Sequence, residues 1–313
     1  MTTPAVRGLA AKYPLAHLVY VTKKEYAPLL SANPHIDRVI GYEGSLFVLC
    51  WQLIKLRPWL IVDLHQSLRS NLLRSMIWCK QIGTYKGSKE REAMVQSRQE
   101  IEPNQFKPLK SLLHMADRHW QAIKKLGIEP DSEGLDYTVL PADIVPQSIV
   151  PFIDGFDFDV VAIGGSHATK RLPNHKLVAL LRTIQKPVVL LGGPADEENG
   201  AQIAGTLALE GRWNIVNACG KLNLRQSGYV LSKCQHVWSH DTGMMHMAAA
   251  LRKPLTTIWG STVPQFGMTP YKVPYQIMQV EGLSCRPCHK HGLAVCPLGH
   301  FRCMEDLEIA VTE

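Results

Sequence analysis

Short apolar runs alternate with longer segments of helical periodicity over most of the chain. In the first half, the apolar runs predict strands at 17–22, 36–40, 59–64 and 82–85. The periodic segments predict helices at 5–12, 23–32, 46–56 and 68–79. Strands that alternate with helices of about ten residues are typical of a parallel, doubly wound sheet. The pattern therefore predicts an α/β fold.

The second half repeats this alternation more cleanly. It predicts strands at 160–163, 187–191, 215–216, 236–239 and 255–259. The helices are predicted at 174–184, 196–209, 224–233 and 244–251. Before the second half, residues 86–108 are polar and low in periodicity, which predicts a long loop, and 112–126 predicts a helix. Prolines recur from 130 to 151, which indicates a linker between two domains, 1–150 and 151–313.

Glycines and small polar residues follow the predicted strands of the second half. Ligands of doubly wound sheets bind beyond the carboxyl ends of the strands, and glycine lets the backbone approach them closely. Lys170 and Arg171 come soon after Gly164-Gly165-Ser166, and they supply positive charge for phosphate oxygens. Asp196, just after Gly192-Gly193, is suited to the hydroxyl groups of a ribose or another sugar. Together these strand ends predict a ligand that contains a nucleotide.

The turn His240-Asp241-Thr242-Gly243 joins a predicted strand to a predicted helix. Asp241 or Thr242 can cap that helix, while its first backbone N–H groups and the positive end of its dipole point outward. Such a helix start binds phosphate or pyrophosphate, although the same turn also fits an ordinary capped helix. In the first half, His65 and Arg69 follow the strand at 59–64. They could hold an anionic acceptor, or they could form only a solvated turn and helix face.

The composition is that of an ordinary globular protein, with 313 residues of which 46% are hydrophobic and 19% charged. No apolar run is long enough to span a membrane, and the N-terminal residues lack the apolar core of a signal peptide, so a cytoplasmic location is expected. The net charge of +7 includes no block of like charge, which argues against a nucleic-acid partner. The absence of a dinucleotide-binding glycine fingerprint, a P-loop and a G-x-S-x-G turn argues against three large classes of enzyme.

Taken together, these segments resemble glycosyltransferase family 9, the lipopolysaccharide heptosyltransferases. The resemblance covers nearly the whole chain and is strongest in the second half. Its most specific part is the run from Asp241 to His246 with the small residues that follow it. The other matching segments of the second half are 165–173, 188–196, 218–222, 285–288 and 296–304. The first half matches more loosely, at 2–6, 22–26 and 63–65.

The resemblance implies the GT-B arrangement, in which two Rossmann-like domains face each other across a cleft. A nucleotide-sugar donor, ADP-heptose in characterised members, would bind the second domain, and a lipid A–core acceptor would bind the first. Transfer would invert the anomeric carbon and would require no metal or other cofactor, and a lipid-linked acceptor would allow peripheral contact with the inner membrane. The implied donor-site residues are Ser166, Lys170, Gly193, Asp196, Lys221, Leu222, Asp241, Thr242, Gly243 and His246. His65 and Arg69 would lie on the acceptor side.

The resemblance also implies roles within the donor site. Ser166 and Lys170 would contact the diphosphate, and Asp241 would bind the sugar. Thr242 and Gly243 would offer backbone N–H groups to phosphate at the start of the helix, and together with Lys170 they would stabilise the leaving diphosphate. His246, one turn into the helix, either supports the same site or is a histidine packed in the core.

The general base proposed for the family is an aspartate in a Ser-Ile-Gly-Asp-like turn, which follows an apolar strand just ahead of a Thr-Thr-Pro segment. In this sequence Met1 directly precedes Thr2-Thr3-Pro4, so that strand and that base are expected upstream of Met1. The resemblance therefore assigns no catalytic residue within the chain. Restoring the upstream residues is expected to raise transfer activity strongly.

Four cysteines of the C-terminal segment, Cys285, Cys288, Cys296 and Cys303, lie near one another in the sequence. Four thiols in a compact loop could hold a structural zinc ion. The last two do not form a second C-x-x-C pair, however, and the resemblance requires no metal. Packed thiols or a disulfide are the alternative.

Two functions of different classes follow from the sequence. A heptosyltransferase-type enzyme predicts binding of an ADP-sugar and release of ADP that depends on the acceptor. A non-catalytic remnant, which binds nucleotide sugars or partner proteins without a base, predicts binding at most. A nucleotide-sugar epimerase on a similar two-domain fold is a more distant third interpretation.

Overall fold

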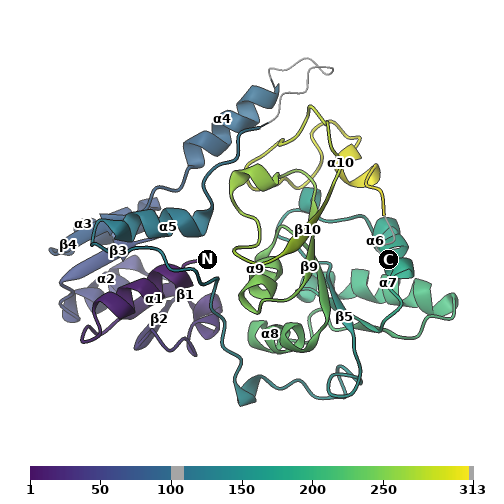
Figure 1. The fold of residues 1–313 in the computed structure, drawn as a ribbon, viewed down its shortest axis with the longest axis horizontal. Helices are drawn as coiled ribbons and strands as arrows, with labels where there is room; N and C mark the ends of the chain where they lie inside the picture. Colours follow the sequence, from purple (N-terminus) through teal and green to yellow (C-terminus); the bar gives the residue numbers. More distant parts are fainter. Residues whose placement is uncertain (100–108, 310–313) are drawn as a thin grey trace. The chain divides into compact units, whose positions relative to one another are not determined.

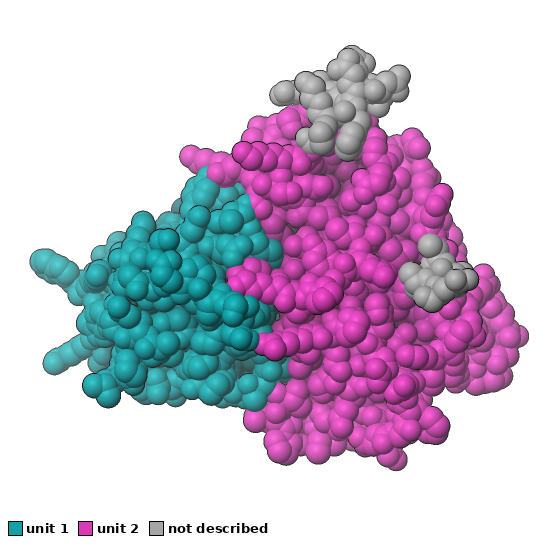
Figure 2. Space-filling view, in the orientation of Figure 1, with its two compact units in different colours: residues 1–87, 113–138 teal, residues 88–112, 139–313 magenta. Residues whose placement is uncertain are grey.

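The computed structural model describes residues 1–99 and 109–309 and divides the chain into two compact units (Figure 1, Figure 2). Unit 1 comprises Met1–Gly87 and Leu113–Thr138, and unit 2 comprises Ser88–Leu112 and Val139–Glu313. The last crossing of the chain from unit 1 to unit 2 lies between residues 138 and 139. The proline-rich stretch predicted this boundary later, near residue 150. The segment 88–112, expected in the first domain, belongs to unit 2.

Unit 2 is built on one six-stranded sheet in which all neighbouring strands are parallel. Its strands, in spatial order, are β10 (Tyr275–Gln279), β9 (Leu255–Trp259), β8 (His236–His240), β5 (Asp159–Ala162), β6 (Val188–Leu191) and β7 (Ile215–Asn217). The chain runs outward from β5 to β7 and then returns to β8 on the other side of β5. The strand order therefore reverses between β5 and β8, the point at which doubly wound sheets bind ligands.

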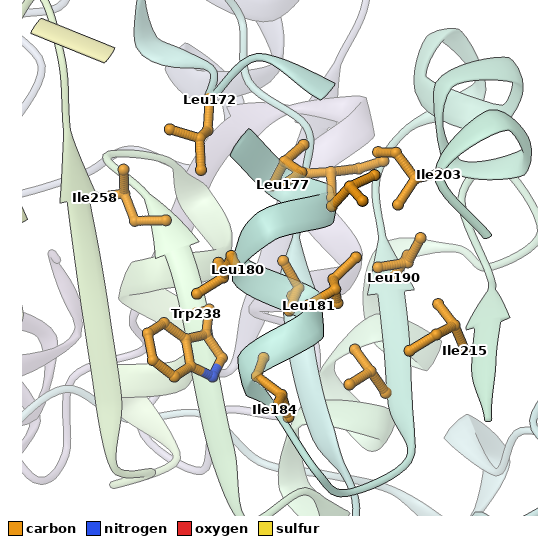
Figure 3. Packing of buried hydrophobic residues seen from close by; sticks show 14 of the residues in the cluster. Leu172, Leu177, Leu180, Leu181, Ile184, Leu190, Ile203, Ile215, Trp238 and Ile258 are labelled. Carbon is orange, nitrogen blue, oxygen red and sulfur yellow. The ribbon is translucent and has the colours of Figure 1, made fainter. Parts of the chain in front are cut away.

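Helices cover this sheet and connect its strands. They are α6 (Asn174–Thr183), α7 (Glu197–Leu209), α8 (Leu224–Lys233), α9 (Gly243–Ala250) and α10 (Arg302–Glu305), with short 3-10 turns η2 (Pro141–Asp143), η3 (Ala168–Lys170), η4 (Pro194–Asp196) and η5 (Pro264–Phe266). Every residue of β5 and β6 is buried, as expected for parallel strands covered on both faces. Figure 3 shows Leu180 and Leu181 of α6 packed in the same cluster as Leu190 of β6. Each such leucine contributes roughly 1.5–3 kcal/mol through burial.

Unit 1 contains two separate pairs of parallel strands. β1 (Val19–Lys23) pairs with β2 (Arg38–Tyr42), β3 (Leu60–Asp63) pairs with β4 (Lys80–Gly83), and no strand among the described residues joins the two pairs. The other elements of the unit are α1 (Thr3–Lys12), η1 (Lys24–Leu29), α2 (Leu46–Lys55), α3 (Leu68–Ser75) and α5 (Met115–Lys124). One buried cluster of the unit is formed by α1 and α5, with Ala5, Trp120 and Ile123.

Several elements differ from those that the sequence predicts. The edge strand β10 of unit 2 was not predicted. The segment 23–32 forms the six-residue 3-10 helix η1 instead of an α-helix. Pro28 lies inside it, and because proline has no N–H and crowds the preceding turn, it stops an α-helix from extending. The predicted loop at 86–108 contains the helix α4 (Ser88–Gln99), and its remaining residues 100–108 lie outside the described part.

Helix α4 was not predicted because it is strongly polar and has almost no apolar stripe. Its Val95 is nevertheless buried, in a small cluster with Val263 and Phe266 of unit 2. Met94 also packs against this cluster, and two adjacent apolar residues leave no helical periodicity in the sequence. Among the described residues, no helix combines the length and the apolar character needed to cross a bilayer.

Candidate functional site

The carboxyl ends of β5, β8 and β9 bring three polar side chains together. Lys170, at the end of η3 after β5, places its Nζ 2.6 Å from Oδ2 of Asp241, which follows β8. The Thr262 hydroxyl, beyond the end of β9, donates to the same carboxylate oxygen at 2.9 Å. Both members of the ion pair are largely withdrawn from water, with side chains 12% exposed. Lys170 and Asp241, which follow different strands, therefore meet at one edge of the sheet.

The start of α9 lies at the same edge. Thr242 is its N-cap in an extended conformation, and neither Thr242 nor Asp241 makes the side-chain capping bond that the sequence suggested. The Asp241 carboxylate is instead bound by Lys170 and Thr262. Gly243 is exposed, and a Cβ built on it would meet no atom within 4 Å. The first turn of α9 is therefore accessible to solvent at Gly243.

Gly165, which follows β5, lies close to Thr242 at the start of α9. A Cβ built on Gly165 would lie 3.5 Å from the Thr242 methyl group, in ordinary contact. Ser166, the next residue, is exposed beside it. The glycine-rich end of β5 and the helix start thus border the same open space, on either side of the point where the strand order reverses.

A second ion pair braces the ends of β5 and β6. Arg171 Nη1 lies 3.0 Å from Asp196 Oδ1, and the Gly193 N–H donates to Asp196 Oδ2 at 2.8 Å. A Cβ on Gly164 or Gly192 would come within 2.5 Å and 2.7 Å of Asp196 atoms, so both positions need glycine. Because protein groups already engage both carboxylate oxygens, Asp196 acts in this structure as a brace, and its contact with a ribose stays a prediction.

His240, the last residue of β8, positions the loop that carries Lys170 and Arg171. Its side chain is fully buried, and its Nε2 accepts a hydrogen bond of 2.9 Å from the Leu172 N–H. Burial is the main cause that lowers the pKa of His240 to about 4, so the imidazole is neutral at pH 7. Sequence reasoning gave no role to His240 or Thr262. Their only signal is that each lies at or just beyond the end of an apolar strand.

The cysteine-rich segment, residues 285–303, makes contacts with the residues that surround Asp241. The Thr169 N–H donates to the Leu293 carbonyl at 3.1 Å, and the Leu293 N–H donates back to the Thr169 hydroxyl at 2.7 Å. The buried Arg286 donates to the Thr262 carbonyl at 2.8 Å. A Cβ on Gly292, which has φ +101°, would fall 3.0 Å from the Lys170 side chain. The segment therefore holds both the lysine and the threonine that bind Asp241.

The four cysteines of this segment are free thiols. Within residues 1–99 and 109–309, no group of three or more histidine, cysteine or acidic side chains is arranged to hold a metal ion. Zinc binding by these thiols stays a prediction. Burial raises the pKa of the Cys288 thiol to about 11 and that of Cys303 to about 12, so both are protonated at neutral pH.

The remaining predicted site residues take part in none of the contacts described above. Lys221 is exposed and Leu222 is half-buried, just beyond the end of β7 at the edge of the sheet. His246 is half-buried within α9. His65 and Arg69 belong to unit 1, where both are exposed and the His65 N–H donates to Asp63 at 2.9 Å. The structure thus groups the predicted donor residues in unit 2 and the predicted acceptor residues in unit 1.

A hollow of about 480 Å³ also lies in unit 2, beside β10. It is lined mainly by β10 and residues 306–308, with Trp238 from the middle of β8. None of the residues that converge at the strand ends lines it. We therefore take the strand ends, where the charged groups gather, as the candidate site.

Residues 152–297 match the family model of glycosyltransferase family 9 (heptosyltransferase). Lipooligosaccharide heptosyltransferase 2 of Haemophilus influenzae is 38% identical over 123 residues, 38% of this chain and 33% of that protein. Lipopolysaccharide heptosyltransferase 2 of Escherichia coli is 32% identical over 100 residues, 31% of this chain and 29% of that protein. The chain thus spans about a third of the length of the curated relatives it matches.

Solved structures extend the similarity of fold to nearly the whole chain. The E. coli ADP-heptose lipopolysaccharide heptosyltransferase II structure has a TM-score of 0.67 at 21% identity, covering 90% of this chain and 87% of that one. A glycosyltransferase family 9 structure from Veillonella parvula has a TM-score of 0.69 at 18% identity, covering 88% and 81%. The fold is therefore α/β of the GT-B type, and residues 152–297 are similar to glycosyltransferase family 9 (heptosyltransferase).

Proposed function

We propose that this chain is an inverting glycosyltransferase that transfers a sugar, heptose in the first instance, from an ADP-sugar to a lipopolysaccharide-core or related glycan acceptor. The observation that carries the proposal is the convergence of Lys170, Asp241 and the start of α9 where the strand order of the sheet reverses. The names of the relatives support heptose as the sugar and lipopolysaccharide as the acceptor. The reaction would take place on the cytoplasmic side of the inner membrane.

The leaving group of such a transfer is a nucleoside diphosphate, which gains negative charge as the glycosidic bond breaks. Lys170 and the first N–H groups of α9 are already held at one edge, and preorganised donors of this kind stabilise developing charge at little reorganisation cost. The exposed Ser166 hydroxyl can donate to a phosphate oxygen from the other side. When Lys170 turns to the diphosphate, Asp241 keeps its bond from Thr262 and can accept from a sugar hydroxyl.

The other roles follow from the resemblance to glycosyltransferase family 9. Lys221 and Leu222 would border the nucleotide base, and Asp196 would contribute to the ribose side of the site only if Arg171 released one of its oxygens. On unit 1, His65 and Arg69 would meet the acceptor. Inversion needs a base that takes the proton of the acceptor hydroxyl, and we assign that role to no residue of the described chain.

Nucleotide binding tests the proposal directly. We expect ADP and ADP-sugars to raise the melting temperature of the chain more than UDP- or GDP-sugars at equal concentration. Lys170→Met removes the charge aimed at the diphosphate and should weaken ADP binding on the order of tenfold to a hundredfold, because charge-assisted hydrogen bonds to phosphate are strong. Calorimetric titration with ADP measures the change.

Lys186→Met is the matched control. Lys186 is an exposed lysine that precedes β6, at the opposite end of the same sheet, and its loss should leave ADP affinity unchanged. Equal weakening by both substitutions would contradict the site. Acceptor-dependent release of ADP then separates the two functional classes: release supports the transferase, whereas ADP-sugar binding without release would leave only a nucleotide-sugar-binding protein.

A further inference from the structure

Arg286, in the cysteine-rich segment, is a buried cation whose printed partners are all uncharged. Its guanidinium group donates to the carbonyl oxygens of Thr262 and Val280, each at 2.8 Å, and to Oε1 of Gln279 at 3.2 Å. No acidic side chain in the part of the chain that the structure describes forms an ion pair with it. Withdrawal of a cation from water is costly, so a buried arginine of this kind needs a reason other than ion pairing.

The guanidinium group joins three segments of unit 2. Gln279 and Val280 lie at and just after the end of β10, and Thr262 lies in the loop that follows β9. The Cys288 N–H donates to the carbonyl of Ser261, the residue before Thr262, at 3.2 Å. Two consecutive carbonyls of this loop are therefore held from the cysteine-rich segment. Because the arginine side chain is a planar fork of fixed geometry, it also fixes the direction of the peptide that it binds.

The side chain of Thr262 points from this fixed peptide to Asp241. Thr262 is 1% exposed, and its hydroxyl donates to Asp241 Oδ2 at 2.9 Å. Lys170 Nζ lies 2.6 Å from the same oxygen. Among the described residues, no hydrogen bond or ion pair engages the other oxygen, Oδ1. The protein thus holds the carboxylate by one oxygen and leaves the second, which can also accept hydrogen bonds, to a ligand.

We propose that Arg286 is a positioning residue of the donor site, which fixes Thr262 so that Asp241 is held by Oδ2 and presents Oδ1 to a hydroxyl group of the transferred sugar. This inference rests on the proposed function. When Lys170 turns to the diphosphate, Thr262 is the contact that stays on Asp241, so its position matters most with the donor bound. The effect concerns the sugar, because neither Arg286 nor Thr262 would touch the nucleotide.

Calorimetric titration of the whole chain with ADP and with ADP-heptose separates the sugar from the nucleotide. Thr262→Val removes the hydroxyl and keeps the shape of the side chain. It should weaken binding of ADP-heptose on the order of tenfold, because a hydrogen bond to a charged group is lost, and should change ADP affinity by less than about twofold. Thr262→Ser keeps the hydroxyl and should restore most of the affinity for ADP-heptose.

Arg286→Lys keeps the charge but lacks the fork that reaches both the Thr262 and Val280 carbonyls. We expect ADP-heptose to bind this variant about fivefold more weakly, with little change for ADP. Because Arg286 acts through Thr262, Arg286→Lys combined with Thr262→Val should bind ADP-heptose no more weakly than Thr262→Val alone. Arg286→Gln, which keeps an amide donor without the buried charge, replaces Arg286→Lys in the comparison if the lysine variant does not fold.

Unit 2 offers a matched control for each substitution. Thr257 is fully buried in β9, and its hydroxyl donates to the Gln276 carbonyl at 2.9 Å, so Thr257→Val loses the same kind of bond outside the site. Arg212 donates to the carbonyls of Leu181 and Ile184 ahead of β7, at the opposite end of the sheet. Thr257→Val and Arg212→Lys should lower the melting temperature and leave the ratio of the two dissociation constants unchanged.

The ratio of the dissociation constants for ADP-heptose and ADP decides the outcome. A purely structural role would weaken both ligands by the same factor, and an unchanged ratio in Thr262→Val and in the Arg286 variant would overturn this inference while the proposed function stands. Additive losses in the double variant would also overturn it, since Arg286 would then act independently of Thr262. If the unchanged chain bound neither ADP nor ADP-heptose, the proposed function would fail and this inference with it.

Discussion

The two units use the same alternation of strand and helix, yet their sheets differ in extent. In unit 2 six strands join into one sheet, and every residue of β5, β6 and β9 is buried. In unit 1 the strands form two separate pairs, in which only Asp63 and Ile82 are buried. Alternation sets the kind of element, whereas the number of strands joined in one sheet sets how much apolar surface leaves water.

The extent of the sheet affects how firmly side chains at its strand ends are held. A continuous sheet holds its strand ends at fixed spacing, so charged groups such as Lys170 and Asp241 can be preorganised at its edge. In unit 1, several apolar side chains of α2 and α3 are exposed.

The largest difference between the units is expected when one strand residue in each is truncated. Leu190→Ala in β6 removes a fully buried side chain and should lower the free energy of unfolding of unit 2 by about 2–5 kcal/mol. Ile61→Ala in β3, whose side chain is only half-buried, should cost unit 1 about 1 kcal/mol. Hydrogen exchange followed by mass spectrometry reports on each unit separately. Equal costs would show that the ribbons of unit 1 are packed as tightly as the sheet of unit 2.

Lowering the pH tests whether the two units lose stability independently of each other. Burial is the main cause that lowers the pKa of His240 in unit 2 and of His119 in unit 1 to about 4. An unfolded histidine titrates near pH 6.5, so below that pH the unfolded chain takes up a proton that the folded chain refuses. Stability is therefore full above pH 6.5 and falls as pH drops toward 4, by up to about 3 kcal/mol for each histidine.

Substitution of one histidine at a time separates the two contributions. His240→Gln should flatten the pH dependence of protection in unit 2 between pH 6.5 and 4 while that of unit 1 persists, and His119→Gln should do the reverse. Hydrogen exchange at a series of pH values, corrected for the intrinsic rate, measures both. If either substitution flattened both units together, they would unfold as one cooperative body.

Two strand-end glycines give the smallest and most local comparison. A Cβ on Gly192 would lie 2.7 Å from Cβ of Asp196, which Arg171 and Gly193 hold in place, so Gly192→Ala should cost about 1–3 kcal/mol. On Gly83 in unit 1 the clashing atom is the flexible end of Gln66, so Gly83→Ala should cost about 0.5 kcal/mol or less. Urea unfolding compares the two, and a larger cost at Gly83 would contradict this account.

Much of unit 2 could be predicted from the sequence. The apolar runs at 160–163, 187–191, 215–216, 236–239 and 255–259 all correspond to strands, with boundaries that shift by a residue or so. The meeting of Lys170 and Asp241 could also be predicted, because carboxyl ends of parallel strands lie at one edge of the sheet. Periodicity failed where a proline tightened η1 and where the polar helix α4 had no apolar stripe.

The sequence by itself determined the kinds of element, their order, and which strand ends carry charge, because these depend on local periodicity and on the parallel connection of neighbouring strands. Only the tertiary structure decided that Thr262 donates to Asp241, that His240 holds the Leu172 N–H, and that Arg286 supports Thr262 from the cysteine-rich segment. It also decided that the outer faces of α2 and α3 stay exposed. Such contacts join residues far apart in the chain, and whether an apolar side chain is buried depends on what packs against it.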